Sequence, residues 1–393
     1  MIHRLLNVTL TEWKLFVTDP AAVLLLVVAG ILYAFYYPTP YMNQTVTRIP
    51  AAIVDLDHSA KSRELTRMAS ATQQIELKSV YNDILEAEQA MAREEIFGFI
   101  VVPENMEKDM LSKKPVTLNI FTHGAYVMLH GSIGTAFSTC ALTLGAVSKV
   151  KAIALSKKVP SAKAMAMRDP MPLSIQTMFN NTGSYSNYVV PSVLVVILQQ
   201  SLVIGICIMG GARGHRRFRK DSRYSSVENE DMPYRYFGRA LAYFLHYCCF
   251  ILFYHFVIYN IFDFPRRGEL LPMMVFAIVF LTSVINFGMC LSQVFLRRES
   301  SMQLFLNLSI PILFLANFSW PTYLMPKWMV WLSYILPSTF AVPAWLSIEQ
   351  MGADIYDVAP KLYLLALQSV FYLILALILT HLRDKSSFKT GDM

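Results

Sequence analysis

The chain has 393 residues, of which 55% are hydrophobic and 16% are charged, and its formal net charge is +7. Soluble domains carry about 25% charged residues, so this composition excludes an ordinary soluble protein and indicates several membrane-spanning helices. The positive charge does not require a nucleic-acid partner, and none is expected, because Lys and Arg that flank spans on the cytoplasmic side account for it.

The first twenty residues are expected to form an amphipathic helix on the cytoplasmic surface of the membrane, in contact with lipid. Asp19 and Pro20 then fit a helix N-cap followed by proline in the first turn, which predicts that the first span begins there. The apolar side chains that recur at helical spacing before this point are Ile2, Leu5, Leu6, Trp13, Phe16 and Val17.

Apolar runs without Asp, Glu, Lys or Arg predict where the chain crosses about 30 Å of hydrocarbon. A further apolar run at 328–348 contains Pro337, Pro343 and several Trp, so the outer segment 319–361 is expected to hold a re-entrant or interfacial pair of short helices. The six predicted spans cover residues 21–37, 188–211, 240–262, 271–296, 302–318 and 362–380.

The distribution of Lys and Arg predicts the orientation of these spans. With the N-terminus inside, the basic residues gather in the cytoplasmic loop 212–239, at Arg297 and Arg298, and after the last span, whereas the short outer loops hold few. Both termini are therefore expected in the cytoplasm, and residues 38–187 outside it.

The segment 38–187 is expected to be an extracytoplasmic α/β domain inserted between the first and second spans. Strands that alternate with helices indicate this class of domain, and the last helix, which is long, would return to the membrane. Strands are expected at 49–55, 75–80, 96–102 and 116–121, and helices at 59–71, 83–94 and 125–158.

No catalytic, metal or cofactor-binding residues are expected in this chain. The pair Asp55-x-Asp57 is similar to a glycosyltransferase metal motif, but a strand end followed by a helix N-cap at Asp57 or Ser59 explains it better. His123 and His130 lack a third zinc ligand. Because the sequence contains no GxxxxGK[ST] phosphate-binding loop, ATP and Mg²⁺ are expected on a partner subunit.

The apolar runs contain histidines and side-chain amides. His246 and His255 lie in the third run, and a packing role is expected for both rather than proton transfer. Amide side chains in lipid join neighbouring helices, and this is the first interpretation of the amides within the runs. They include Gln199, Gln200, Asn286, Asn307 and Asn317.

Four segments, in order along the chain, resemble the ABC-2 type permeases, which are the membrane subunits of bacterial ABC exporters. The resemblance implies a six-span helical protein of the bacterial inner membrane that pairs with a second copy or a paralogue. It also implies a cytoplasmic ABC ATPase partner and, in some members, a periplasmic membrane-fusion adaptor. The segments are TEWKLFVTDP (11–20), IPAAIVDLDHSAKSRELTRM with IFGFIVVPENMEKDML (49–68 and 96–111), NYVVPSVLVVILQQSLVIG (187–205) and FSWPTYLMPKWMVWLSYILPSTF (318–340).

The resemblance also suggests where coupling and transport take place. The second cytoplasmic segment of the family usually carries a Gly-Thr-x-Glu stretch that docks onto the ATPase, which loop 212–239 lacks. The basic half of this loop fits a topology anchor. Its acidic half is the expected ATPase-coupling element, formed by Glu228, Glu230, Asp231, Pro233 and Tyr234. Spans two and five line the dimer interface in the family, so a substrate path is expected along Gln199, Gln200, Asn307 and Asn317.

The sequence thus predicts the permease subunit of an exporter that moves an amphipathic substrate, such as a drug or lipid, outward. A separate ATPase would drive it, and the chain itself would not be an enzyme. Two alternatives stay open. An ion-coupled secondary carrier is disfavoured by the absence of carboxylates from the apolar runs. A membrane-tethered binding or receptor protein would work without any ATPase.

Overall fold

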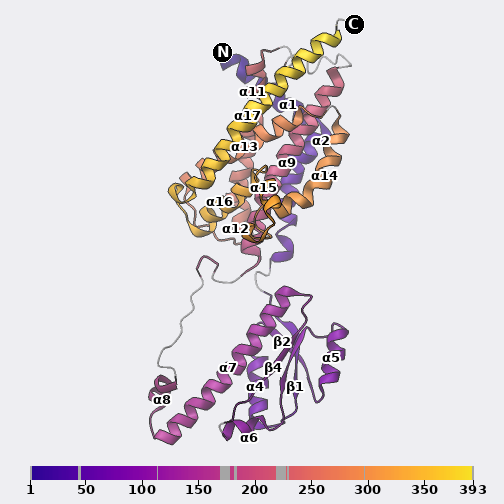
Figure 1. The fold of residues 1–393 in the computed structure, drawn as a ribbon. Helices are drawn as coiled ribbons and strands as arrows, with labels where there is room; N and C mark the ends of the chain where they lie inside the picture. The colour runs from indigo at the N-terminus through magenta and orange to yellow at the C-terminus, as the bar shows by residue number, and fades with distance from the viewer. Residues whose placement is uncertain are drawn as a thin grey trace. The chain divides into compact units, whose positions relative to one another are not determined.

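A computed structural model describes residues 2–42, 46–112, 114–168, 178–180, 184–217, 227, 230–295 and 297–391. The chain divides into two units, which we call unit 1 (residues 1–44 and 177–393) and unit 2 (residues 45–176). Figure 1 shows that unit 1 is built from helices and that unit 2 combines helices with a sheet. Each unit is described by itself below.

Unit 1 begins with the helix α1, and the polypeptide then runs through a first span that contains a short π-helical turn, η1. After unit 2, the chain returns to unit 1 at α9. The elements of unit 1 are α1 Ile2–Thr18, α2 Pro20–Val23, η1 Leu24–Val28, α3 Ala29–Tyr36, η2 Thr39–Tyr41, α9 Ser186–Arg217, α11 Met232–Phe253, η3 Tyr254–Ile258, α12 Tyr259–Ile261, α13 Leu270–Ser292, α14 Arg298–Leu315, η4 Thr322–Leu324, α15 Lys327–Ser333, α16 Ser338–Met351 and α17 Ile355–Gly391.

Within the described residues, six helices are long and apolar enough to cross a membrane, so the chain is a multi-pass membrane protein. Five belong to unit 1 and match predicted spans, whereas the sixth is the helix α7 of unit 2, Val127–Lys157. The predicted span 302–318 corresponds to α14, which is not among the six because its 18 residues begin with Arg298 and Glu299. The five of unit 1 are Pro20–Tyr41, Ser186–Arg213, Met232–Ile261, Leu270–Ser292 and Ile355–Arg383.

The segment before α17 contains the expected pair of short helices. The helices α15 and α16 are bent by 79° relative to each other, and Pro337 is the N-cap residue of α16. Pro343 was also expected to break a helix, but it lies inside α16 and does not end it.

The helix α9 forms the centre of unit 1 and packs against α13, α14 and α16. Its buried side is almost wholly apolar, and glycine allows the closest approach to α13. A Cβ at Gly210 would lie 2.7 Å from the Cβ of Ser292 and 2.9 Å from its carbonyl oxygen, so a larger residue there would push α13 away.

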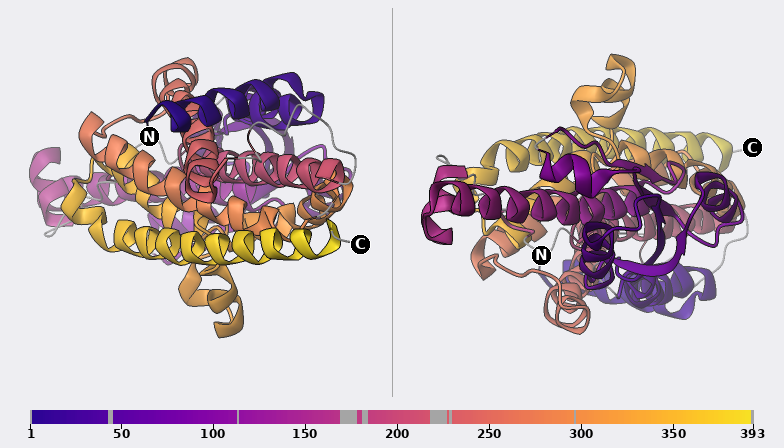
Figure 2. Two further views of the ribbon diagram at one scale, coloured as in Figure 1. Left: turned by 90° about the horizontal axis from the view of Figure 1, so that it is seen from above. Right: turned by 90° about the horizontal axis from the view of Figure 1, so that it is seen from below.

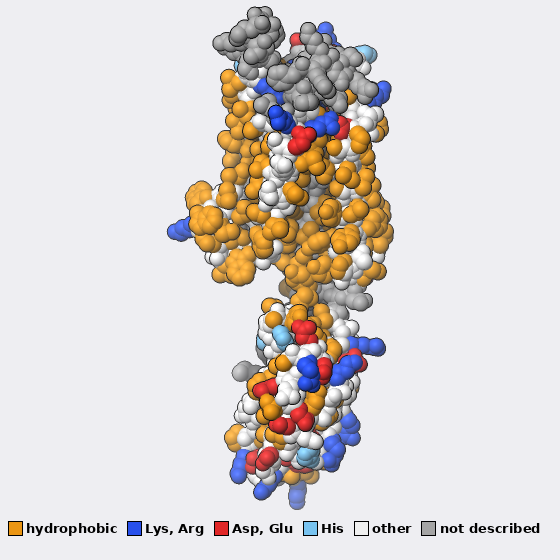
Figure 3. All heavy atoms as spheres, turned by 90° about the vertical axis from the view of Figure 1, so that its right-hand side faces the viewer, with side chains coloured by type: hydrophobic (Ala, Val, Ile, Leu, Met, Phe, Trp, Pro, Cys, Tyr) orange, Lys and Arg blue, Asp and Glu red, His pale blue; other side chains and the backbone are white. Residues whose placement is uncertain are grey.

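The surface of unit 1 is that of a protein immersed in lipid. Hydrophobic side chains cover most of the face that Figure 3 draws, and charged side chains gather towards one end. The face of unit 2 in the same figure mixes acidic, basic and apolar side chains, which is typical of a water-exposed surface.

Unit 2 contains a four-stranded sheet in the order β2-β1-β3-β4. The strand β1 is parallel to β2 and β3, whereas β3 is antiparallel to β4. The elements are β1 Ile49–Asp55, α4 Ala60–Ser70, β2 Ile75–Tyr81, α5 Ile84–Ala92, β3 Gly98–Val102, α6 Met106–Leu111, β4 Asn119–Thr122, α7 Val127–Lys157 and α8 Ser161–Arg168.

Alternation along the central strands builds a core on each face of this sheet, because successive side chains of a strand point to opposite faces. Ile53 and Ile100 join the core that includes side chains of α4 and α7. Val54 and Phe99 join the core with α5 on the other face. Figure 1 shows α4 and α7 beside the sheet, and the right-hand view of Figure 2 shows α7 running past it.

The Asp55-x-Asp57 pair has the structural role that was expected of it. Asp55 Oδ1 accepts hydrogen bonds from the backbone N–H groups of Asp57 and His58, and Asp57 Oδ2 accepts one from Glu107. Ser59 is the N-cap of α4. Among the residues that the structure describes, no group of three His, Cys, Asp or Glu is placed to hold a metal ion.

Candidate functional site

The N-terminal helix α1 has two different faces. Val8, Thr9, Glu12 and Phe16 are buried, chiefly against α11. The predicted apolar stripe lies mostly on the other face, where Ile2, Leu6, Trp13 and Val17 are exposed and only Phe16 is fully buried. The helix therefore packs against the rest of unit 1 through one face. Its other face is apolar and uncovered, as that of a helix at a membrane surface would be.

A glycine on α11 lets α1 approach closely. A Cβ at Gly238 would lie 2.6 Å from Val8 Cγ1 and 2.7 Å from Val8 Cβ. Further along α1, the ring of Phe16 stacks on that of Tyr243, with the ring centroids 5.6 Å apart. The spacing of Val8 and Phe16 along α1 thus brings the residue between them, Glu12, against α11 as well.

Glu12 is fully buried, and its carboxylate joins three helices. Its Oε1 accepts hydrogen bonds from Arg213, near the end of α9, and from the Tyr243 hydroxyl at 2.8 Å. Its Oε2 lies 3.7 Å from Nε of Arg239 on α11. A buried charge is tolerated only when it is paired, and here both arginines are themselves only 7% exposed. We call these four residues the Glu12 cluster.

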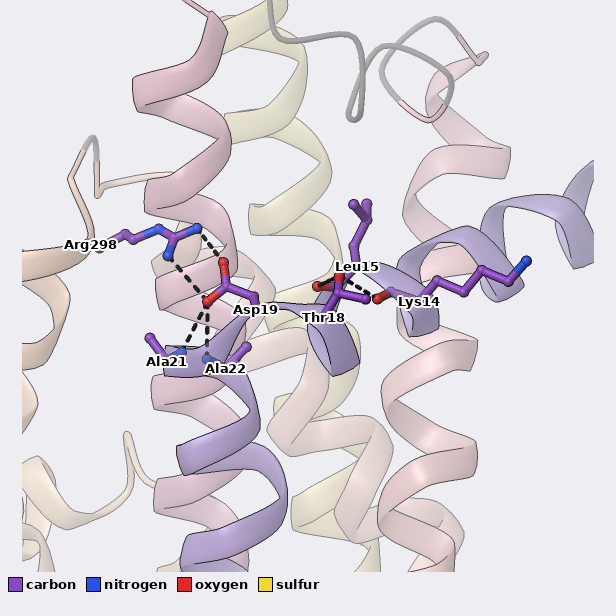
Figure 4. A network of polar contacts seen from close by, with 7 residues as sticks. All are labelled: Lys14, Leu15, Thr18, Asp19, Ala21, Ala22 and Arg298. Carbon is purple, nitrogen blue, oxygen red and sulfur yellow. Dashed lines mark hydrogen bonds and ion pairs between the residues drawn. The ribbon is translucent and has the colours of Figure 1, made fainter.

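The junction between α1 and the first span is fixed by a second carboxylate, shown in Figure 4. Asp19 Oδ1 accepts hydrogen bonds from the backbone N–H groups of Ala21 and Ala22, so it caps α2 as predicted. The same carboxylate binds both terminal nitrogens of Arg298, at 3.2 and 2.5 Å, and Arg298 is the first residue of α14. Two-point guanidinium–carboxylate pairs are strong and directional.

Hydrogen bonds continue from α11 into the centre of unit 1. The hydroxyl of Tyr236 donates to Asn286 Oδ1 on α13 at 2.9 Å, and Asn286 Nδ2 donates to the hydroxyl of Ser369 on α17 at 2.9 Å. Asn286 therefore joins neighbouring helices, as predicted for the intramembrane amides. A displacement of α11 would act on α13 and α17 through these contacts.

The predicted coupling residues lie at the start of α11, next to α1. Asp231 is the N-cap residue of α11 and lies 3.5 Å from Arg4 of α1, with both side chains mostly exposed. The guanidinium of Arg4 also lies 6.0 Å from the ring centroid of Tyr234. Pro233 is exposed in the first turn and Glu230 is half-buried, whereas Glu228 lies outside the described residues.

The residues of the predicted substrate path have different surroundings. Gln199 is buried, and its amide makes hydrogen bonds of 2.6 and 3.1 Å with Ser338 of α16. Gln200 follows it and is half-buried. Asn307 is exposed and bonds within its own helix, α14, and Asn317 follows that helix with a φ of 61°. Because α9 packs against α14, the helices named for the path are neighbours.

A second buried carboxylate lies near the far end of α16. Both oxygens of Glu349, which is fully buried, are 3.0 and 3.1 Å from Nδ1 of His255 on η3. His246, on α11, forms a 3.1 Å contact with the carbonyl oxygen of Leu26. Both histidines thus make the hydrogen bonds expected of a packing role.

Sequence reasoning missed the Glu12 cluster and Glu349, although each left a signal. Glu12 occurs four residues after Val8 and four before Phe16, so it lies on a buried helical face where an acid requires a partner. Glu349 directly follows the apolar run 328–348, and an acid at the end of such a run indicates a buried cation or imidazole in the same way.

The sequence is similar to a known family of membrane proteins. The sequence matches the family described as "ABC-2 family transporter protein" over residues 21–378. The matched range covers both units but begins after α1. No curated protein matches the sequence.

Proposed function

The chain belongs to the ABC-2 family of transporter proteins, and from that premise we propose that it is the membrane subunit of an exporter driven by a separate ATPase subunit. Members of this family are membrane transport subunits, generally without a nucleotide site of their own, and the family implies an ATPase partner in an ABC system. The direction of transport, an amphipathic substrate and the docking of the ATPase at α1 and α11 belong to the proposal.

The observation that carries the proposal is the Glu12 cluster. Removing one partner of a buried ion pair costs about 3–5 kcal/mol, so the separation of α1 from α9 and α11 is strongly unfavourable. A force applied to α1 or to the start of α11 therefore acts on the central helix α9. Asp19 and Arg298 extend the same connection to α14.

The start of α11 supplies a surface that a soluble partner could grip. Asp231 and Pro233 are exposed there, and Arg4 of α1 lies against both Asp231 and Tyr234. Charged groups of this kind set the register and orientation of a docked partner more than its affinity. In this proposal, ATP binding closes the partner subunits and displaces α1 together with α11.

The displacement would re-pack the spans around α9 and open a path outward for an amphipathic substrate. We place both termini in the cytoplasm and unit 2 outside it, where unit 2 would guide the substrate or bind a periplasmic membrane-fusion adaptor. A second copy of the chain, or a paralogue, would complete the path at a dimer interface that includes α9 and α14. ATP and Mg²⁺ would bind only to the ATPase.

The test is co-purification of the full chain from its native membrane in mild detergent, followed by an ATPase assay in lipid nanodiscs. We expect a P-loop ATPase to co-purify with the chain. The variant Asp231→Lys should no longer stimulate the ATP hydrolysis of that partner, while the amount of chain inserted in the membrane stays normal. The matched control is Asp354→Lys, which changes an exposed acid just before α17. If no ATPase accompanies the chain, a binding or receptor protein becomes the better interpretation.

One observation favours a second candidate function, an ion-coupled carrier. The pair of His255 and Glu349 places a buried carboxylate against an imidazole, and such groups relay protons in carriers. The candidate predicts uphill transport by the chain alone in sealed vesicles under a pH gradient, and loss of that transport in Glu349→Gln. Absence of transport without an ATPase would eliminate it.

A further inference from the structure

Unit 2 contains a groove along the C-terminal half of α7. The groove has a volume of about 760 Å³, which lies in the range of small-molecule sites. In Figure 1 this half of α7 extends beyond the sheet. Its other wall is formed by α6 and by residues of the segment 114–118, which precedes β4; residues 116–118 of this segment were expected to belong to that strand.

One helical face of α7 lines the groove from end to end. The lining residues of α7 recur every three or four positions, which places them on a single face. Most of them are small, so the groove is open along this face. They are Ala141, Leu144, Gly145, Ser148, Lys149, Ala152, Ile153 and Ser156.

The groove is apolar inside and basic at its edge. Met106, Met110 and Leu118 face Leu144 across it, whereas Lys114 and Lys149 are exposed. Lys114 pairs at 3.7 Å with Asp109. The helix α7 itself contains no Asp or Glu, so its lysines give the α7 edge of the groove a positive potential.

One polar atom inside the groove has no partner within the described part of the chain. The hydroxyl oxygen of Ser148 is shielded from solvent and forms no hydrogen bond there. Serine in a helix commonly bonds to the carbonyl four residues earlier, as Thr143 does to Thr139 on the same helix. The Ser148 hydroxyl, beside Lys149, therefore has a hydrogen-bonding capacity that the described part of the chain does not use.

We propose that this groove binds an acidic amphiphile, with its acyl chain along the apolar face of α7 and its anionic headgroup beside Lys149 and Ser148. Apolar walls take the chain, and the lysine at the edge selects an anionic headgroup over a cationic one. This inference rests on the proposed function and deepens it, because it assigns an acid-bearing lipid as the class of substrate that unit 2 receives.

The experiment uses the full chain in lipid nanodiscs and a palmitic acid analogue that carries a diazirine on its acyl chain. After irradiation and proteolysis, mass spectrometry locates the labelled peptides. We expect labelling within residues 106–118 and 144–156, and competition by unlabelled palmitate. A second probe, with the same chain but an ammonium headgroup, measures the selectivity for an acid.

Two glycines of α7 offer a matched pair of variants. A Cβ at Gly145 or at Gly134 would meet no atom within 4 Å, so neither position opposes a larger side chain, and only Gly145 lines the groove. We expect Gly145→Phe to reduce labelling about tenfold, which corresponds to about 1.4 kcal/mol of binding free energy. Gly134→Phe should label as the unchanged protein does.

The headgroup is tested by charge reversal. Lys149→Glu should reduce labelling by the palmitic acid probe and increase labelling by the ammonium probe, whereas Lys157→Glu, on the same helix but outside the lining, should change neither. Equal labelling by both probes in every variant would overturn the proposal and indicate a general apolar face, such as one that binds a partner helix. Labelling confined to the helices of unit 1 would also overturn it.

This experiment separates the groove from the proposed transport function. The labelling requires neither ATP nor an ATPase, so its failure leaves the coupling of α1 and α11 untouched. If the groove is labelled as expected but no ATPase co-purifies with the chain, the proposed binding site is supported and the proposed exporter function is rejected.

Discussion

Within the described residues, two carboxylates of unit 1, Glu12 and Glu349, are fully buried, and they have different partners. Glu12 of α1 forms a hydrogen bond with Arg213 of α9, and its Oε2 lies 3.7 Å from Nε of Arg239 on α11. The carboxylate of Glu349 is held by His255. Figure 1 shows that α1 and α16 lie towards opposite ends of unit 1, and Figure 2 shows α1 along one side of it.

The difference between the two carboxylates lies in what each partner can do. An arginine side chain keeps its charge at every physiological pH, so the Glu12 cluster is a permanent link between helices. A histidine ring offers a single N–H group to a carboxylate at Nδ1, so the link between Glu349 and His255 joins only two helical segments. The first arrangement suits the transmission of force, whereas the second suits the anchoring of α16.

The largest effect is expected from removing the permanent link. Glu12→Ala leaves Arg213 and Arg239 buried without their carboxylate, and we expect unit 1 to lose about 3–5 kcal/mol of stability. The midpoint of thermal unfolding of the purified chain measures this loss. Glu299→Ala removes an exposed acid from α14 and serves as the control. An unchanged midpoint for Glu12→Ala would mean that the cluster does not hold α1.

The second carboxylate should show a smaller loss. His255→Ala leaves a buried acid without its partner, and we expect a cost of about 1–3 kcal/mol. Glu349→Gln keeps a polar group that can bond to the imidazole and should cost less than His255→Ala. The same unfolding measurement ranks the two variants. If His255→Ala proved as costly as Glu12→Ala, the contrast between the two ends would disappear.

The junction at Asp19 separates the charge of a carboxylate from its capping role. Asparagine caps helices about as well as aspartate, so Asp19→Asn should lose only the charged pair with Arg298. Asp19→Ala should lose the cap too, at a further cost of about 0.5–2 kcal/mol. Equal midpoints of thermal unfolding for the two variants would show that the cap contributes nothing here.

The smallest effect on stability is expected at the exposed pair. Asp231 and Arg4 are mostly exposed and 3.5 Å apart, and such pairs contribute about 0.2–1 kcal/mol. Asp231→Lys should therefore leave the unfolding midpoint within about that range. A large loss of stability would mean that Asp231 helps to hold α1 against α11 instead of forming part of a docking surface.

Much of unit 2 could be predicted from the sequence, because its strands and helices have clear boundaries. The strand β1 has the predicted bounds, and α4, β2, α5 and α7 begin and end within two residues of their predicted positions. The strands β3 and β4 begin later than predicted, and Val116 and Leu118, which were expected in the last strand, line the groove instead.

Composition was less informative for the helices. The helix α7 is apolar and long enough to cross a membrane, yet it packs against a sheet, whereas α14 begins with Arg298 and Glu299 although it overlaps a predicted span. Hydropathy measures the side chains that a helix carries, and it does not identify what surrounds them.

The polar links of unit 1 could not be predicted because their partners are distant in the sequence. Glu12 is 201 residues from Arg213 and 231 from Tyr243, and His255 is 94 residues from Glu349. A single sequence indicates that a buried acid needs a partner, but the choice of partner depends on how the helices pack. Asp231 was easier to select because its exposure follows from the local composition, whereas Tyr234 is half-buried.

The central claim is that the ATPase binds where α1 meets the start of α11. The most direct test replaces Tyr234 with a photo-crosslinking amino acid in the full chain in its native membrane, with Tyr356 as the matched control position. Tyr356 is 90% exposed in the first turn of α17, far along the chain from the proposed docking surface. We predict a cross-link to a P-loop ATPase from position 234 and none from position 356. A cross-link from position 356 alone, or none from either position while the ATPase co-purifies, would contradict the account.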